Sequence, residues 1–126
     1  MSETNKQLER IAALIESHRF NFEDEAQLQA GIEEVLRKEG VEFVRECRLG
    51  AGDRVDFLIT EPECADIALE VKLATSLVAI SRQLWRYSRF LSVGALLLVT
   101  TRQRHKALPT EMNGKPLRVI ALEVAF

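Results

Sequence analysis

The segment Ala95–Thr101 (ALLLVTT) constrains the fold of this 126-residue chain more than any other feature. A strand with apolar side chains on both faces is typical of a sheet that helices cover on both sides. Even when it is extended back to Val93, the segment is far shorter than the roughly 20 apolar residues of a membrane-spanning helix. It therefore predicts a buried central strand in an α/β protein.

The spacing of apolar residues predicts the elements around this strand. Some segments have the helical period, and others have the alternation or the short apolar run of a strand. The predicted helices are Asn5–His18, Glu23–Glu39 and Thr75–Ser92, and the other predicted strands are Val41–Leu49, Arg54–Thr60, Ile67–Leu73 and Pro116–Val124. The order α-α-β-β-β-α-β-β, without a linker or repeat, predicts one α/β domain with a sheet flanked by helices.

Charge is distributed unevenly along the chain. The net charge is −2, but residues 1–70 carry 17 acids and 8 bases, whereas residues 71–110 carry 7 bases and no acid. A polyanion meets one surface of a protein rather than its average charge, so the basic segment is a candidate phosphate-facing region. The alternative is that these bases belong to an ordinary solvated surface.

Composition also narrows the class of protein. The N-terminal residues Met1–Lys6 are polar and lack the apolar core of a signal peptide. Cys47 and Cys64 are 17 residues apart, which fits neither a disulfide framework nor a zinc site. His18 and His105 share no ligand spacing with an acid, and we expect both on the surface. These features predict a cytoplasmic protein with reduced thiols and no membrane segment.

Charged side chains occur in two predicted strands that are otherwise apolar. Glu70 and Lys72 share one face of Ile67–Leu73, and Asp56 has the equivalent place in Arg54–Thr60. Charges on a buried strand are costly unless they have a use. Paired carboxylates suit Mg²⁺, a metal-bound water is more acidic, and a nearby lysine stabilises charge on a phosphate. The three residues predict phosphodiester hydrolysis; the alternatives are a surface ion pair and an unrelated solvent-facing aspartate.

These residues resemble the signature of the PD-(D/E)XK nuclease superfamily, an acid on one strand and Glu-x-Lys on the next. Here the acid is Asp56 in Arg-Val-Asp-Phe-Leu-Ile, and the second motif is Glu70-Val71-Lys72. The resemblance implies a restriction-endonuclease-like αβββαβ core, with a mixed central sheet flanked by helices. It also implies that Asp56, Glu70 and the main-chain carbonyl of Val71 bind Mg²⁺, for which Mn²⁺ substitutes, and that Lys72 is the catalytic lysine. Position 55 is Val where the family name has Pro.

A second similarity lies in the third predicted helix, where Gln83-Leu84-Trp85-Arg86-Tyr87 fits the Gln-x-x-x-Tyr motif of RecB-like nucleases. Residues four apart share a helix face, so Gln83 and Tyr87 are expected at the edge of the active site. The alternative is that they are part of an amphipathic cover. The apolar stripe of this helix is predicted to be Leu77, Ile80, Leu84 and Leu91, and the residues expected to face the DNA backbone are Arg82, Arg86 and Arg89.

The superfamily often adds an acid from the helix before the first hairpin. Glu25 is the first candidate because it stands at the start of the second predicted helix. Glu33 and Glu34 compete with it, and Glu46 on the following strand is a further candidate. The resemblance covers about residues 23–101, which leaves an additional helix within 1–20 and a strand extension at 102–126 of the single predicted domain, 1–126.

The resemblance implies a magnesium-dependent deoxyribonuclease. A domain of this size has little room for a module that reads a long sequence, so structure-selective or partner-directed cutting is expected. The first helix, with Leu8, Ile11 and Ile15 on one face, is a candidate interface for a homodimer or for a partner protein that directs substrate choice. The alternatives are a non-catalytic DNA-binding or assembly subunit with a nuclease-like fold, and an RNA-directed nuclease.

Overall fold

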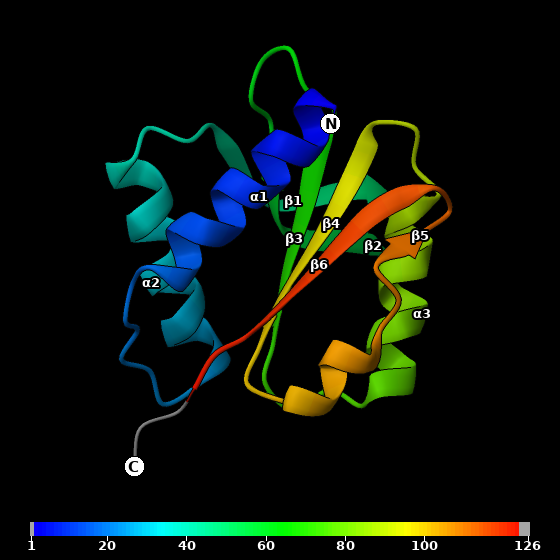
Figure 1. The fold of residues 1–126 in the computed structure, drawn as a ribbon. Helices are drawn as coiled ribbons and strands as arrows, with labels where there is room; N and C mark the ends of the chain where they lie inside the picture. The colour runs from blue at the N-terminus through cyan, green and yellow to red at the C-terminus, as the bar shows by residue number, and fades with distance from the viewer. Residues whose placement is uncertain (1, 124–126) are drawn as a thin grey trace.

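The central strand predicted from its apolar run is β4 (Val93–Thr100), which lies in the middle of a mixed sheet. The computed structural model describes residues 2–123. Its helices are α1 (Glu3–Glu16), α2 (Glu25–Lys38) and α3 (Leu77–Ser88), with a short 3₁₀ helix η1 (Gln103–Ala107). Its other strands are β1 (Phe43–Gly50), β2 (Asp53–Ile59), β3 (Asp66–Lys72), β5 (Glu111–Met112) and β6 (Lys115–Ala121). The strand order is β1-β2-β3-β4-β6-β5 (Figure 1).

Strand direction divides the sheet into two parts. β1, β2 and β3 are antiparallel neighbours, whereas β3, β4 and β6 run parallel to one another. The parallel strands need crossover connections, and α3 provides the one between β3 and β4. The carboxyl ends of β3, β4 and β6 therefore meet at one edge of the sheet.

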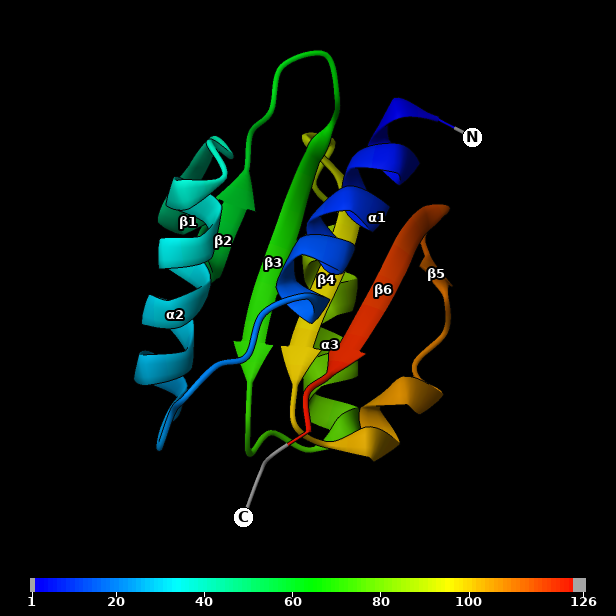
Figure 2. The same ribbon diagram turned by 60° about the vertical axis from the view of Figure 1, so that its left-hand side comes forward.

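Helices cover both faces of the sheet, which is why β4 is apolar on both sides. Figure 2 shows α1 and α2 in front of the sheet and α3 behind it. Leu97 and Val99 of β4 lie in the core under α1 and α2, whereas Leu96 and Leu98 lie in the core under α3. The expected α/β class is confirmed, with six strands and three α-helices in the described residues.

The first helix is not an exposed apolar surface, contrary to expectation. Leu8, Ile11 and Ile15 are buried in the core against the sheet. Arg118 of β6 also forms ion pairs with two glutamates of α1, Glu9 at 3.3 Å and Glu16 at 3.0 Å. The apolar face of α1 is therefore used within the domain and offers no dimer interface.

The third helix is shorter than predicted. It ends at Ser88, and Leu91, which was expected in its apolar stripe, is 99% exposed. Phe90 instead packs toward Gly50 of β1, where an added Cβ would lie 2.8 Å from the Phe90 ring. The helix therefore ends before Leu91, and Phe90 rather than Leu91 packs against the core.

The segment after β4 also differs from expectation. Neither η1 nor β5 was predicted, and β6 begins and ends near Lys115 and Ala121 rather than at Pro116 and Val124. Val124 lies outside the described residues. The Asn113-Gly114 pair has positive φ at both residues, 50° and 74°, as a two-residue hairpin turn between β5 and β6 requires.

His105 of η1 is buried rather than on the surface. Its Nε2 lies 3.0 Å from the Thr75 carbonyl, which can only accept, so Nε2 carries the proton. Its Nδ1 then accepts from the Thr100 hydroxyl at 2.9 Å. Burial lowers the pKa of His105, and the neutral ring joins the ends of β3 and β4. In the described residues, no helix is long and apolar enough to cross a membrane.

Candidate active site

Strands β2 and β3 separate at the predicted acids. Their pairing includes Ile59 opposite Ile67 and reaches Phe57 opposite Leu69, where it stops. Beyond that point β2 stays paired with β1, and β3 stays paired with β4. The first residue past the last pair is Asp56 on β2 and Glu70 on β3. The two acids therefore stand at the opening of a gap between neighbouring strands.

The two carboxylates bridge this gap reciprocally. Glu70 Oε1 accepts a hydrogen bond from the backbone N–H of Asp56 at 3.1 Å. Asp56 Oδ2 accepts one from the backbone N–H of Val71 at 2.8 Å. Each side chain thus satisfies a backbone donor that has lost its partner in the sheet ladder. The two acids, predicted from separate strands, therefore each bond the backbone of the other acid's strand, at the other acid or directly after it.

The second oxygen of Glu70 meets the other two predicted side chains. Lys72 Nζ lies 3.4 Å from Glu70 Oε2, and the lysine side chain is 23% exposed. The Tyr87 hydroxyl from α3 shares its proton between the Arg54 carbonyl at 2.9 Å and Glu70 Oε2 at 3.3 Å. Tyr87 is fully buried rather than at the helix border, so it fixes the Glu70 carboxylate from beneath.

Burial and mutual repulsion act on the ionisation of this cluster. Burial raises the pKa of Glu70 to about 7, and the nearby Asp56 carboxylate adds to the effect. The pKa of Asp56 is raised as well, again mainly by burial, against the Val71 hydrogen bond and the charge of Lys72. Burial and the charge of Glu70 raise the pKa of Tyr87, so its hydroxyl stays protonated. Such a pair is stabilised by a proton or by a cation.

Glu25 is the helical acid that reaches the site. The Asp24 side chain caps α2 by accepting from the Gln27 N–H at 2.8 Å, which places Glu25 in the first turn. Glu25 Oε1 accepts from the backbone N–H of Leu73, directly after β3, at 3.2 Å. Figure 2 shows the start of α2 near the carboxyl end of β3. The charge of Glu25 also contributes to the raised pKa of Asp56.

The competing acids have other surroundings. Glu33 forms ion pairs with Arg37 at 2.8 Å and with Arg45, and both lower its pKa. Glu34 and Glu46 are exposed. Arg45 bears on the site indirectly, because its Nε donates to the backbone carbonyl of Asp56 at 3.2 Å and so fixes β2 there.

The other predicted residues of the third helix form no hydrogen bond or ion pair with the acids in the described residues. Gln83 is half-buried, and in residues 2–123 it forms no hydrogen bond with them. Arg82 and Arg89 are exposed, at about 140° and 160° around the helix from Tyr87. Arg86 is bound to Asp53 of β2, with Nε 2.9 Å from Oδ1. The tyrosine of the motif reaches the site, whereas the arginines lie away from it.

Arg102, just after β4, was missed by the sequence reasoning. Its Nε donates to the backbone carbonyl of Leu73 at 3.0 Å. The backbone N–H of the same residue donates to Glu25, so both side chains bond Leu73. The terminal guanidinium nitrogens of Arg102 remain able to bind a phosphate. No signal within either strand locates it, because its place depends on the register between β3 and β4, in which Lys72 lies opposite Thr100.

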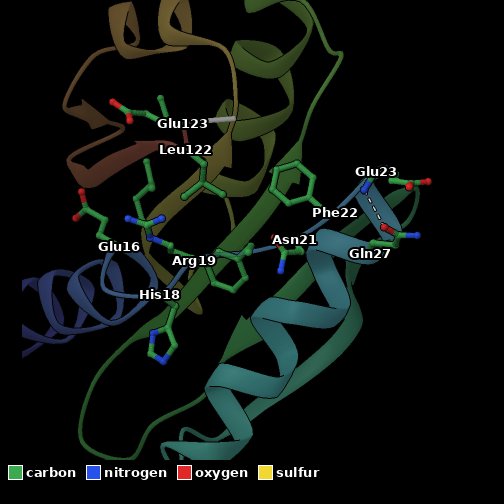
Figure 3. Close-up of a pocket in the computed structure, with 12 residues that line it drawn as sticks. Glu16, His18, Arg19, Asn21, Phe22, Glu23, Gln27, Leu122 and Glu123 are labelled. Atoms are coloured by element: carbon green, nitrogen blue, oxygen red, sulfur yellow. Dashed lines mark hydrogen bonds between the residues drawn. The ribbon is translucent and has the colours of Figure 1, made fainter. Parts of the chain in front are cut away.

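A hollow of about 800 Å³ opens at the same edge of the sheet. It lies between the α1–α2 connection and the end of β6, with Arg19, Phe22, Gln27 and Leu122 among its lining residues (Figure 3). Gln27 belongs to the same end of α2 as Glu25, but Asp56, Glu70 and Lys72 do not line the hollow. The acids therefore occupy the gap between the strands and not this hollow.

The oxygen donors of the site come from two carboxylates, Asp56 and Glu70. In the described part of the chain, no three His, Cys, Asp or Glu side chains form a metal cage. Mg²⁺ does not require one, because it commonly binds one or two carboxylates and takes waters and substrate phosphates as its other ligands. Asp56 and Glu70 are oxygen donors whose repulsion a cation would relieve. The two residues fit Mg²⁺ in this mode.

No protein-family model matches the chain, and comparisons with curated proteins and with solved structures give no match. The function is therefore inferred from the arrangement of its own side chains. That arrangement defines a class: an α/β domain in which two acids and a lysine gather where two strands of the sheet part.

Proposed function

We propose that this protein is a metal-dependent nuclease of the PD-(D/E)XK superfamily, in its RecB-like group, and that it hydrolyses phosphodiester bonds in DNA. One observation carries the proposal: Asp56 and Glu70 bond each other's strands across the β2–β3 gap, with Lys72 Nζ 3.4 Å from Glu70. A charged cluster of this kind is costly to bury and is typical of a functional site.

The order of elements supports the proposal. The segment α2-β1-β2-β3-α3-β4 has the αβββαβ order of a restriction-endonuclease-like core, and α1, η1, β5 and β6 are additions to it. The motif residues fall on the elements expected for them: Glu25 on α2, Asp56 on β2, Glu70 and Lys72 on β3, and Tyr87 on α3.

The chain's own residues have distinct roles in the proposed reaction. Asp56 and Glu70, with the Val71 carbonyl, would hold Mg²⁺, which when bound supplies a Lewis acid and a more acidic water. Lys72 places a positive charge beside the carboxylates and stabilises charge on the phosphate under attack. Tyr87 orients Glu70, and Glu25 fixes the peptide that follows Lys72.

The test is cleavage by the wild-type protein of single-stranded, duplex and branched DNA, with RNA of matched sequence, in Mg²⁺, Mn²⁺ or EDTA. We expect metal-dependent cleavage of DNA, with a preference for one DNA structure. Lys72→Ala should lower the rate at least about 100-fold because charge stabilisation is lost. Lys38→Ala, at the far end of α2, is the matched control and should cleave normally.

The same assay separates the alternatives. DNA binding without cleavage of any of these substrates would favour a non-catalytic DNA-binding or assembly subunit. Cleavage of RNA alone would favour an RNA-directed nuclease. Cleavage that persists in Lys72→Ala and in EDTA would overturn the assigned site.

A further inference from the structure

The solvent-facing side of α3 is unusually apolar and basic. It consists of Val78, Arg82, Trp85 and Arg89, which we call the outer face of α3. Val78 is 61% exposed and Trp85 is 46% exposed. Their positions follow the i, i+4, i+7, i+11 spacing of one helix side. Tyr87 points the opposite way, toward Glu70, so one side of α3 contacts the acids and the other side faces solvent.

A shallow groove adjoins this face. It has a volume of about 400 Å³ and is lined by Leu77, Val78, Ser81, Arg82, Ala107, Leu108 and Pro109. Figure 1 shows η1 beside the first turns of α3, and the lining residues come from these turns, from the end of η1 and from the two residues after it. The lining is mainly aliphatic, and Arg82 stands at its edge. The groove therefore extends the outer face of α3 as a continuous apolar surface with a basic margin.

The charged side chains of α3, η1 and the groove lining are all basic, and Asp53 of β2, which reaches this helix, is paired with Arg86. Residues 71–110, which include all of α3, η1 and the groove lining, contain no aspartate or glutamate. Arg104 and Lys106 of η1 are exposed beside the groove. Arg89 lies over the Trp85 ring, with its guanidinium carbon 5.2 Å from the ring centre. A complementary occupant needs both negative charge and apolar side chains.

We propose that the outer face of α3 and its groove dock an acidic amphipathic segment of a partner protein. Leucine or phenylalanine side chains of such a segment would enter the aliphatic groove, and its carboxylates would face Arg82, Arg104 and Lys106. A nucleic-acid strand fits less well, because its polar sugar–phosphate backbone would lose hydration over Leu77, Leu108 and Pro109. The inference does not depend on nuclease activity, since none of these residues contacts the acids.

Trp85 provides the probe, because it is the only tryptophan in the chain. The experiment titrates the whole protein with a synthetic peptide carrying Leu and Phe at i, i+3, i+4 and i+7 and Glu elsewhere. We expect a saturable change in Trp85 fluorescence that weakens as salt is added. A peptide of the same composition in scrambled order and a single-stranded DNA oligonucleotide are titrated in parallel.

Matched variants localise the binding. Val78→Glu places a negative charge in the groove margin, where it repels the carboxylates of the peptide, and should weaken peptide binding at least about tenfold. Val44→Glu alters another exposed valine, on β1, and should bind as the wild type does. No saturable change up to ~1 mM peptide would overturn the proposal. So would equal weakening by Val44→Glu, equal binding of the scrambled peptide, or tighter binding of the oligonucleotide at Trp85.

Discussion

The two halves of β3 are buried to a similar degree but are held in different ways. From Ile67 to Leu69 the strand pairs with β2 through the backbone, and apolar side chains fill both faces. From Glu70 to Lys72 no backbone hydrogen bonds join β3 to β2. The carboxylates of Glu70 and Asp56 instead accept from the N–H groups of Asp56 and Val71 across the gap. Glu70 is nevertheless only 1% exposed.

This difference shows how a sheet accommodates a charged site. The apolar half obtains its stability from packing, and any loss of volume there is felt directly. The charged half keeps its hydrogen bonds satisfied but holds two like charges in a poorly solvated place. We therefore expect the first half of β3 to govern the stability of the domain and the second half to govern its proposed activity.

The largest expected effect is on the stability of the apolar half. Leu69→Ala should lower the free energy of unfolding by about 2–5 kcal/mol, because it leaves a cavity in a fully buried site. Glu70→Gln should change it by less than about 1 kcal/mol, since glutamine retains an acceptor for the Asp56 N–H and removes a buried charge. Chemical denaturation measures both variants, and cleavage should be lost only in the second.

An opposite result would revise the division. If Glu70→Gln unfolds as readily as Leu69→Ala, the carboxylate bridge is chiefly structural. If Leu69→Ala abolishes cleavage while remaining fully folded, the two halves of β3 are not separable.

The second effect is stabilisation by metal. Under the proposed function, Mg²⁺ at 100 times its dissociation constant should raise the free energy of unfolding by about 2.7 kcal/mol, because it would bind the folded site and not the unfolded chain. Asp56→Asn should reduce this gain, since one of the two carboxylate ligands is lost. Thermal melts with and without EDTA measure it, and an equal gain in both proteins would place the metal elsewhere.

The third effect distinguishes the edge of the site from the outer face of α3. Arg102→Gln should raise the KM for DNA about tenfold with little change in kcat, because Arg102 is expected to bind a phosphate near Leu73. Arg82→Gln, on the outer face, should leave KM within about twofold. A larger rise in KM for Arg82→Gln than for Arg102→Gln would indicate that the arginines of α3 contact the DNA.

The smallest effect is a pH dependence at the end of β3. Burial lowers the pKa of His105, so the folded state favours the neutral ring and loses stability as pH falls below the ordinary histidine value of 6.5. Protonation puts a positive charge on a buried ring, near the charges of Arg102 and Arg104, and so destabilises the folded state. Thermal melts at a series of pH values should show this acid-side loss in the wild type and in His18→Gln, but not in His105→Gln. An unchanged loss in His105→Gln would assign it to other groups.

The sequence predicted the local features of this fold better than the distant ones. The strand carrying Glu70 and Lys72 was predicted because alternation and charge are read within a few residues. The choice of Glu25 could not be settled by spacing, since it depends on where α2 meets the end of β3. Leu91 was misplaced because α3 ends at Ser88, so the helical period does not extend to it, and Phe90 packs against Gly50 instead.

His105 and Arg102 were also beyond reach for a physical reason. The surroundings of His105 come from Thr75 and Thr100, which only the finished sheet brings together. Arg102 gains its place from the register between two parallel strands, which has no signal within either strand. Side chains that join separate elements are therefore the part of the site that sequence patterns leave open.

The burial of α1 under β6 has a consequence for synthesis. Glu9 and Arg118 are separated by 109 residues along the chain, yet they pair across this contact. At a translation rate of about 5–20 residues per second, α1 leaves the ribosome roughly 5–20 s before β6 is complete. Throughout that interval Leu8, Ile11 and Ile15 lack part of their cover. The apolar face of α1 therefore stays partly uncovered on the nascent chain until β6 is made, and during that time it is open to aggregation.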